Sequence, residues 1–247
     1  MVKQKSNGRL NITIHPNQSL GTDRQMVLMA QDGELDIILP PTAKLSHIIP
    51  ELQIFDFPFL FPRAELAPAV LDGKGGTTLL EKFQEHNLIG VAFWESGFKQ
   101  LTTNKPILTV ADFKDQNFRI MESSVIQDQF EEWGSDTRTI DFGKTYDALK
   151  AGIVDGQENP LNSIIGMKFD QVQKYLYLSD HGYLAQVLVF SKKTLEKLPK
   201  ELQDILIESG LEVTKFQRKE SQKKHEELVP EIKEKALTYC IARASVE

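Results

Sequence analysis

Short apolar runs alternate with amphipathic helical segments along the chain, and this alternation constrains the fold more than any other feature. The runs at 36–41 (DIILPP), 88–93 and 118–121 (FRIM) predict buried strands, whereas 77–86 and 144–151 predict helices. Alternating strands and helices predict an α/β protein with mainly parallel sheets. Such sheets bind ligands at the carboxyl ends of their strands, so we expect the functional residues there.

The first and last segments of the chain carry further local signals. Leu10–Ile14 alternates apolar and polar residues and predicts a strand, and Thr22–Gln25 matches a capping box that begins a helix. With a parallel strand at 36–41, these segments predict a βαβ unit. Residues 199–236 predict a long helix that Pro230 kinks or ends.

Length and charge exclude several classes of protein. The 247 residues allow one large domain or two smaller lobes with a sizeable core. A net charge of −6 without a basic stripe argues against a nucleic-acid partner. No run of about 18 apolar residues is present, so we expect no membrane-spanning segment. The opening MVKQKSNGRL lacks the apolar core of a signal peptide.

Metal and disulfide sites are not expected from the sequence. Cys240 is the only cysteine, so neither a disulfide framework nor a cysteine-based zinc site can form within the chain. The five histidines are scattered without the spacing of a metal motif. We therefore expect no metal and no cofactor.

The stretch GIVDGQENPLNSI, at 152–164, predicts a rapid succession of elements. Gly152 ends the helix at 144–151, Ile153-Val154 forms a very short strand, and Asp155-Gly156 makes a turn. Asn159 and Pro160 then stand at the N-cap and first position of the next helix. On this interpretation Asn159 caps a helix and has no other role.

A second interpretation of the same stretch gives it a ligand. A helix N-terminus has unsatisfied N–H groups and a partial positive charge, so it attracts an anion. The Asn159 amide could donate to a carboxylate there, and Arg119, in the strand FRIM at the same edge, could add two parallel hydrogen bonds.

The residues also leave an enzyme open as an alternative. Asp155 and Glu158 are neighbouring acids, and with His181 they could form a general acid/base set. The sequence has no GxSxG, no phosphate-binding GxxxxGK[ST] and no GxGxxG after a strand. We therefore expect that the protein is not an enzyme.

Several spaced motifs resemble one known family, and they occur in order from about Ser6 to about Leu237. This is the DctP family, the extracytoplasmic solute receptors of TRAP (tripartite ATP-independent periplasmic) transporters. The stretches that carry the resemblance are HPNQSLGTDRQM, ESGFKQLTTNKPI, FKDQNFRIMES, KTYDALKAGIVDGQENPLNSI and MKFDQVQKYLYLSDHGYL.

The resemblance implies a two-lobed fold like that of periplasmic binding proteins, with mainly parallel sheets joined by a hinge and a long helix. Residues 1–95 would form lobe I and 96–185 lobe II, and 186–247 would return to lobe I and end in the long helix. The family's signal peptide, first strand and start of the first helix have no counterpart here. KALTYCIARASVE, at 235–247, does not resemble the family's continuation. We therefore expect that N- and C-terminal parts of the family fold are missing.

The resemblance also assigns candidate ligand contacts. Arg119 matches the arginine that holds the ligand carboxylate, Asn159 the asparagine beside it, and Phe142 an aromatic that packs over the ligand. Positions that are basic in many members, or that line the cleft, correspond to Lys99, Lys44, Gln186 and Tyr183. From the residues alone, Phe142 would be a core residue, and both lysines would be solvated.

The function that the resemblance implies is binding without chemistry. Two lobes would close on a small organic anion, and the receptor, as a monomer in the periplasm, would dock transiently on the membrane subunits of a TRAP transporter. Three basic residues, Arg119, Lys99 and Lys44, could neutralise two carboxylates, so we expect a four-carbon dicarboxylate such as succinate, fumarate or malate. Another organic acid, such as a sugar acid, and a ligand-sensing module remain alternatives.

Overall fold

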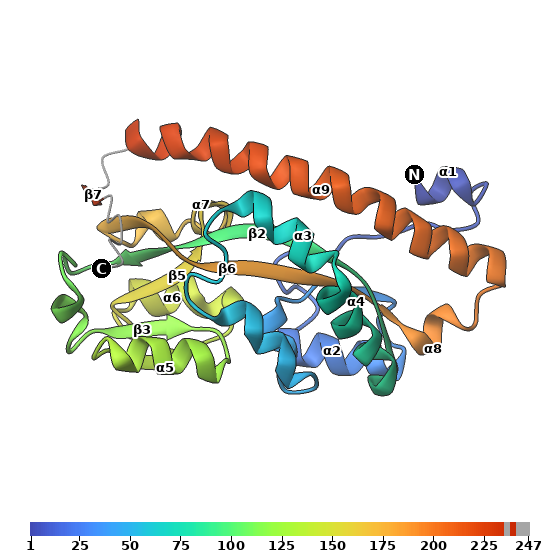
Figure 1. Ribbon diagram of the computed structural model, residues 1–247, viewed down its shortest axis with the longest axis horizontal. Helices are drawn as coiled ribbons and strands as arrows, with labels where there is room; N and C mark the ends of the chain where they lie inside the picture. The colour runs from blue at the N-terminus through green and yellow to red at the C-terminus, as the bar shows by residue number, and fades with distance from the viewer. Residues whose placement is uncertain (235–237, 241–247) are drawn as a thin grey trace. The chain divides into compact units, whose positions relative to one another are not determined.

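The computed structural model describes residues 1–234 and 238–240 (Figure 1). Its contacts divide the chain into two compact units. Unit 1 comprises Met1–Leu52, Glu65–Glu95 and Ala185–Glu220; unit 2 comprises Gln53–Ala64, Ser96–Leu184 and the described residues from Ser221 onward. These limits lie next to the expected boundaries at 95 and 185, and differ from them for 53–64 and for the residues after 220.

Unit 1 combines helices with parts of two long strands. The chain enters unit 2 from unit 1 along strand β2 (Leu88–Thr103) and returns along β6 (Tyr175–Ser191). The short strand β1 (Ile37–Ile38) pairs with β6, and Ile37 lies opposite Phe190. The helical elements are α1 (Val2–Lys5), α2 (Asp23–Asp32), η1 (Thr42–Leu45), η2 (Pro50–Asp56, which ends in unit 2), η3 (Ala64–Leu66), α3 (Ala67–Leu71), α4 (Lys74–Glu81), η4 (Lys82–His86), α8 (Lys192–Leu195) and α9 (Lys200–Glu234, which continues into unit 2).

The predicted βαβ unit is wrong, although its helix is correct. Thr22 caps α2 with a full capping box, and Gly33 ends it with φ 79°. Residues 10–14 form no strand; Ile14 is 81% exposed, and no described strand pairs with this segment. Of the strand predicted at 36–41, only Ile37–Ile38 (β1) forms, and it is antiparallel to β6 and not parallel to a neighbour. Local alternation specifies a strand only where a neighbouring strand supplies hydrogen bonds.

The core of unit 1 lies where α9 packs on β2 and β6. Val91, Leu188 and Phe190 from the strands and Leu206 from the helix are buried together. A Cβ atom on Gly210 would lie 2.9 Å from a Leu188 methyl carbon, so glycine permits the close approach of helix and sheet.

Unit 2 contains a mixed sheet in the order β6-β2-β5-β3-β4, and β7 also pairs with β6. The central β5 (Gly156–Pro160) is antiparallel to β2 and parallel to β3 (Asn117–Ile120). β3 is parallel to β4 (Asp136–Thr139), and β6 to β7 (Thr238–Cys240). The helical elements are η5 (Val110–Phe113), α5 (Ser124–Glu132), η6 (Phe142–Lys144), α6 (Thr145–Lys150), α7 (Leu161–Gly166) and η7 (Phe169–Gln171).

The predicted arrangement of 152–164 is wrong in its middle. The strand occupies Gly156–Pro160 and not Ile153-Val154, so Asp155-Gly156 makes no separate turn. Helix α7 begins at Leu161 after Pro160 (ψ 153°), and no side chain caps it. Asn159 therefore belongs to a strand and is not an N-cap. Pairing of β5 with both neighbours outweighs the local preference of Asn-Pro for a helix start.

The long C-terminal helix is confirmed, and it passes through Pro230 to Glu234. Beyond Ser221 it belongs to unit 2, where Leu228 and Ile232 are buried in a core with Leu161 and Phe169. The divergent segment 235–247 lies outside the described residues except for Thr238–Cys240. Within the described part of the chain, no helix is both long and apolar enough to cross a membrane.

Candidate functional site

Arg119 and Asn159 lie near the carboxyl ends of two adjacent parallel strands in unit 2. Arg119 is the third residue of β3, and its Cα partner in β5 is Gln157, two residues before Asn159. Partners in register, and residues two apart in a strand, share a face of the sheet. The strand predicted for Arg119 is therefore confirmed. Asn159 lies in a strand and not at the predicted helix start.

The Arg119 side chain is fixed although it carries a permanent charge. It is 1% exposed, and its Nε donates to the carbonyl oxygen of Ile140 at 2.9 Å. Burying a guanidinium ion is unfavourable unless it binds a complementary group, and its planar fork matches a carboxylate.

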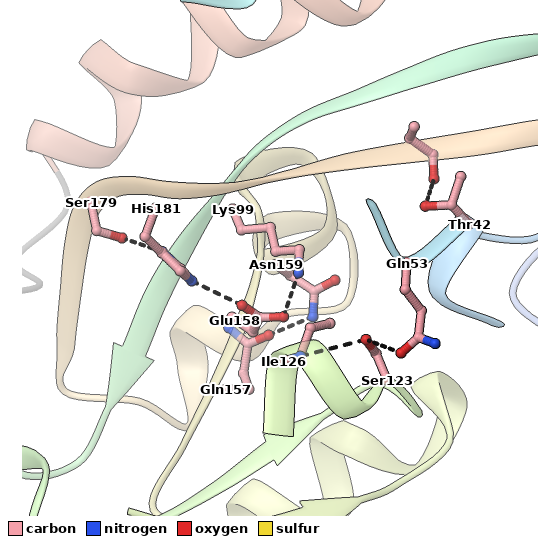
Figure 2. A network of polar contacts seen from close by, with 11 residues as sticks. Thr42, Gln53, Lys99, Ser123, Ile126, Gln157, Glu158, Asn159, Ser179 and His181 are labelled. Carbon is pink, nitrogen blue, oxygen red and sulfur yellow. Dashed lines mark hydrogen bonds and ion pairs between the residues drawn. The ribbon is translucent and has the colours of Figure 1, made fainter. Parts of the chain in front are cut away.

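A chain of side-chain hydrogen bonds orients Asn159 on the same face. Its Nδ2 donates to Gln157 Oε1 at 2.6 Å (Figure 2). Gln157 Nε2 in turn donates to Thr102 Oγ1 at 2.9 Å. All three residues are at most 3% exposed. The Asn159 amide is therefore held by the sheet itself and not by a helix N-terminus.

Glu158 lies between Gln157 and Asn159 and points to the opposite face, where it joins two basic side chains. Its Oε1 is 2.7 Å from Lys99 Nζ, and its Oε2 is 2.8 Å from His181 Nε2 (Figure 2). The other ring nitrogen of His181 lies 2.7 Å from Ser179 Oγ. Side chains alternate between the faces of a strand. Gln157 and Asn159 therefore belong to the polar cluster on one face, and Glu158 belongs to the cluster on the other.

The Lys99–Glu158–His181 chain keeps Glu158 ionised despite its burial. Burial alone would raise the pKa of the Glu158 carboxyl. The Lys99 charge and the His181 hydrogen bond outweigh this effect and lower the pKa to about 2. Lys99, expected from the residues alone to be solvated, is instead 1% exposed, and its charge is already balanced by Glu158.

A further buried acid was missed by sequence reasoning. Asp56, the last residue of η2, is 2% exposed. Burial raises the pKa of its carboxyl to about 6, although the Lys99 charge and the Ser123 hydroxyl lower it. Its surroundings in the sequence, FDFPFLF at 55–61, are apolar. No local signal there distinguishes a buried Asp from a solvated one.

The two predicted aromatic contacts pack against other rings. Phe142 is half-buried, and its ring centroid lies 6.0 Å from that of Phe169 in the core of unit 2. Tyr183 is 2% exposed and makes edge contacts with Phe61 at 5.0 Å and Phe98 at 5.5 Å. These contacts fit the interpretation of Phe142 as a core residue, which the sequence left open.

The remaining predicted contacts, Lys44 and Gln186, belong to unit 1. Gln186 forms an isolated antiparallel bridge with Pro41, and the Lys44 amide donates to the Pro41 carbonyl at 3.0 Å. The structure thus connects the backbone of both residues to Pro41. Lys44 is 8% exposed and so is not the solvated side chain that the residues alone suggested.

The three residues of the predicted acid/base set do not all contact one another. Glu158 contacts His181, but Asp155 forms an ion pair with Lys105 at 3.1 Å and accepts a hydrogen bond from the Asn117 amide at 2.9 Å. Within the described part of the chain, no group of three or more His, Cys, Asp or Glu residues could hold a metal ion.

Comparison with known proteins gives one consistent family. The family model DctP, "Bacterial extracellular solute-binding protein, family 7", matches residues 1–243. The chain is 36% identical to the C4-dicarboxylate-binding protein DctB of Bacillus subtilis over 94% of this chain and 67% of that protein.

Two solved structures show the same fold with different ligands. A TRAP periplasmic solute-binding protein from Sulfurospirillum deleyianum, with bound succinate, is 35% identical with a TM-score of 0.93, covering 97% of this chain and 79% of that one. The sugar acid binding protein DctPAm from Advenella mimigardefordensis, in complex with galactonate, is 34% identical with a TM-score of 0.94, covering 96% and 77%.

Proposed function

Because the chain belongs to the DctP family of bacterial extracellular solute-binding proteins, we propose that it is the receptor of a TRAP transporter for a four-carbon dicarboxylate such as succinate, fumarate or malate. The protein is a binding protein for organic acids and not an enzyme. It would act outside the cytoplasmic membrane as a monomer and deliver its ligand to the membrane subunits of the transporter.

The observation that carries this proposal is the buried Arg119 guanidinium near Asn159 at the carboxyl ends of β3 and β5. Arg119 would hold one ligand carboxylate with two parallel hydrogen bonds, and Asn159 would donate a further one. Arginine is suited to this role because it cannot lose its charge in a protein.

The other predicted residues would complete the ligand contacts. Phe142 and Tyr183 would supply apolar surface, and Lys44 and Gln186 remain predicted ligand contacts. Lys99 has a different part in this proposal, because its charge is balanced by Glu158. It would donate a hydrogen bond to the ligand without adding a full unpaired positive charge.

Two observations bear on the ligand class. The B. subtilis relative is named for C4-dicarboxylates, and the S. deleyianum structure contains succinate, which favours dicarboxylates. The Lys99–Glu158 pair, however, removes one of the three charges that a dicarboxylate would use. A sugar acid with a single carboxylate, like the galactonate bound to DctPAm, is therefore the second candidate.

Thermal unfolding of the full chain with a panel of acids tests the proposal. A ligand that binds only the folded state adds about 2.7 kcal/mol to the free energy of unfolding at a hundredfold excess over Kd. Succinate, fumarate and malate should raise the Tm of the wild type. Arg119→Ala should abolish the shift, and Arg119→Lys should reduce it because lysine cannot form the bidentate pair.

Arg138→Ala is the matched control. Arg138 is the Cα partner of Arg119 in β4 and is exposed, so its removal changes the charge equally and should leave the shift intact. A shift with galactonate alone would favour the sugar acid. A cooperative transition that no acid shifts would contradict the proposal.

A further inference from the structure

Hydrogen bonds of residues before and after Asp56 hold it beside the bonded side chains of Lys99, Glu158 and His181. Three residues before it, the Gln53 side chain accepts hydrogen bonds from the backbone amide of Ser124, at 3.1 Å, and from its hydroxyl, at 2.8 Å. Three residues after it, the Phe59 amide donates to the His181 carbonyl at 2.9 Å. Asp56 therefore lies between the start of α5, which follows β3, and the part of β6 that carries His181.

The Asp56 carboxyl has an acceptor that the folded chain does not use. Its Oδ2 atom is buried and has no hydrogen-bond partner among the described residues. Leaving a buried carboxylate oxygen unpaired costs free energy, and such exceptions in native structures call for an explanation. Lys99, whose charge acts on the Asp56 carboxyl, is already bonded to Glu158.

The charges around Asp56 determine which ligand group could approach it. Lys99 attracts the Asp56 carboxylate, whereas the ionised Glu158 repels it. A second ligand carboxylate placed there would face two acidic side chains and one shared ammonium group. A neutral donor avoids this repulsion, and the neutral donor that organic acids commonly carry is a hydroxyl group.

We propose that Asp56 is a specificity-determining residue, whose carboxylate accepts a hydrogen bond from a hydroxyl group of the bound acid. The inference rests on the proposed function, because it assumes that the organic acid held by Arg119 extends past the strand ends to the face of the sheet that carries Lys99. It makes the receptor prefer hydroxy acids, such as malate, over acids of the same skeleton without the hydroxyl group, such as succinate. A site built to bind a hydroxyl group rejects the analogue that lacks it, because the acceptor then stays unpaired.

The test compares two matched ligand pairs by calorimetry on the full chain. Malate and succinate differ by one hydroxyl group on a dicarboxylate, and erythronate and butyrate differ by hydroxyl groups on a monocarboxylate. The wild type should bind the hydroxy acid of at least one pair about tenfold or more tightly, which corresponds to one hydrogen bond to a charged acceptor. Asp56→Ala should reduce that ratio to near one.

Two further variants separate a specific role from a structural one. Asp56→Asn keeps the shape and one acceptor oxygen but removes the charge, so it should retain part of the preference. Asp136→Asn, in exposed β4, removes the same charge elsewhere and should leave the ratio unchanged. The readout is the ratio of two affinities measured on the same variant. A general loss of stability lowers both affinities by the same factor and leaves this ratio unchanged.

The outcomes distinguish the two proposals. Binding of malate and succinate with equal affinity and no preference for erythronate over butyrate would overturn the role of Asp56 and leave the proposed function standing. A preference that Asp56→Ala leaves unchanged would do the same. Binding of erythronate but of neither dicarboxylate, with a preference that depends on Asp56, would support the role and overturn the dicarboxylate. Binding of no acid would overturn both.

Discussion

The Lys99 ammonium and the Glu158 carboxylate lie 2.7 Å apart, and both side chains are almost completely buried. A buried ion pair adds little net stability compared with an apolar pair, but removing one partner leaves an uncompensated charge. Lys99 and Glu158 are 59 positions apart in the sequence, so the pair joins β2 to β5 across the sheet of unit 2.

We expect strong non-additivity between these two residues. Lys99→Met and Glu158→Gln should each lower the free energy of unfolding by about 3–5 kcal/mol, because each removes the ion-pair partner of a buried charge. The double variant should lose clearly less than the sum of the two losses. Urea unfolding at pH 7 measures all three.

The exposed pair of Lys105 and Asp155 provides the control for this cycle. These side chains are 53% and 27% exposed, and Lys105→Met should cost less than about 1 kcal/mol. If the loss in the double variant equalled the sum of the losses in Lys99→Met and Glu158→Gln, the two residues would not be coupled.

Glu158 should make stability depend on pH in the acid range. Its pKa is about 2 in the folded protein and near 4.5 when unperturbed, so the folded state favours the ionised form. The resulting stability is present above about pH 4.5 and is lost as the pH falls towards 2, with a total on the order of 3 kcal/mol. Urea unfolding of the wild type and Glu158→Gln should therefore differ at pH 7 and converge near pH 2. A constant difference across this range would contradict the assignment.

Asp56 should have the opposite effect at a higher pH. Burial raises the pKa of its carboxyl from 3.8 to about 6, so the folded state favours the protonated form, despite the nearby Lys99. Its contribution is present below about pH 4 and is lost as the pH rises through 6, on the order of 3 kcal/mol. Asp56→Asn should be more stable than the wild type at pH 7.5 but not at pH 4, as measured by Tm at both pH values. A gain of equal size at the two pH values would show that Asp56 does not titrate in this range.

The sequence predicted the features that local signals specify, but not the contacts of Lys99, Glu158 and Asp56. Helix α2 was predictable because the Thr22 capping box and Gly33 are signals within a few residues. Arg119 was placed correctly because FRIM is a short apolar run that packs as a strand. Both signals are local, so they do not depend on how the rest of the chain folds.

The rest of the site depends on contacts between distant segments. Asn159-Pro160 has the composition of a helix start, but pairing with the neighbouring strands β2 and β3 makes it part of strand β5. Lys99 looked solvated because its partner, Glu158, becomes its neighbour only when β2 and β5 pair. Asp56 could not be identified at all, because burial of one acid in an aromatic connection leaves no periodic pattern.

Gly156 should be essential for the position of Asn159. A Cβ atom there would overlap the Thr102 carbonyl oxygen of β2 and lie 2.5 Å from the Phe118 ring of β3. Gly156→Ala must therefore push β5 away from both neighbours, at a cost of about 1–3 kcal/mol or more. The shift would also move Asn159, three residues further along the strand, so the variant should bind the ligand more weakly even where it remains folded.

Gly166→Ala is the matched control for this substitution. Gly166 ends helix α7, and nothing lies within 4 Å of the added Cβ atom. Because alanine is a better helix former than glycine, Gly166→Ala should leave the free energy of unfolding unchanged or raise it by up to about 1 kcal/mol. Urea unfolding and ligand calorimetry on both variants decide the matter. If Gly156→Ala kept wild-type stability and affinity, the tight packing of β5 between β2 and β3 could not be what positions Asn159.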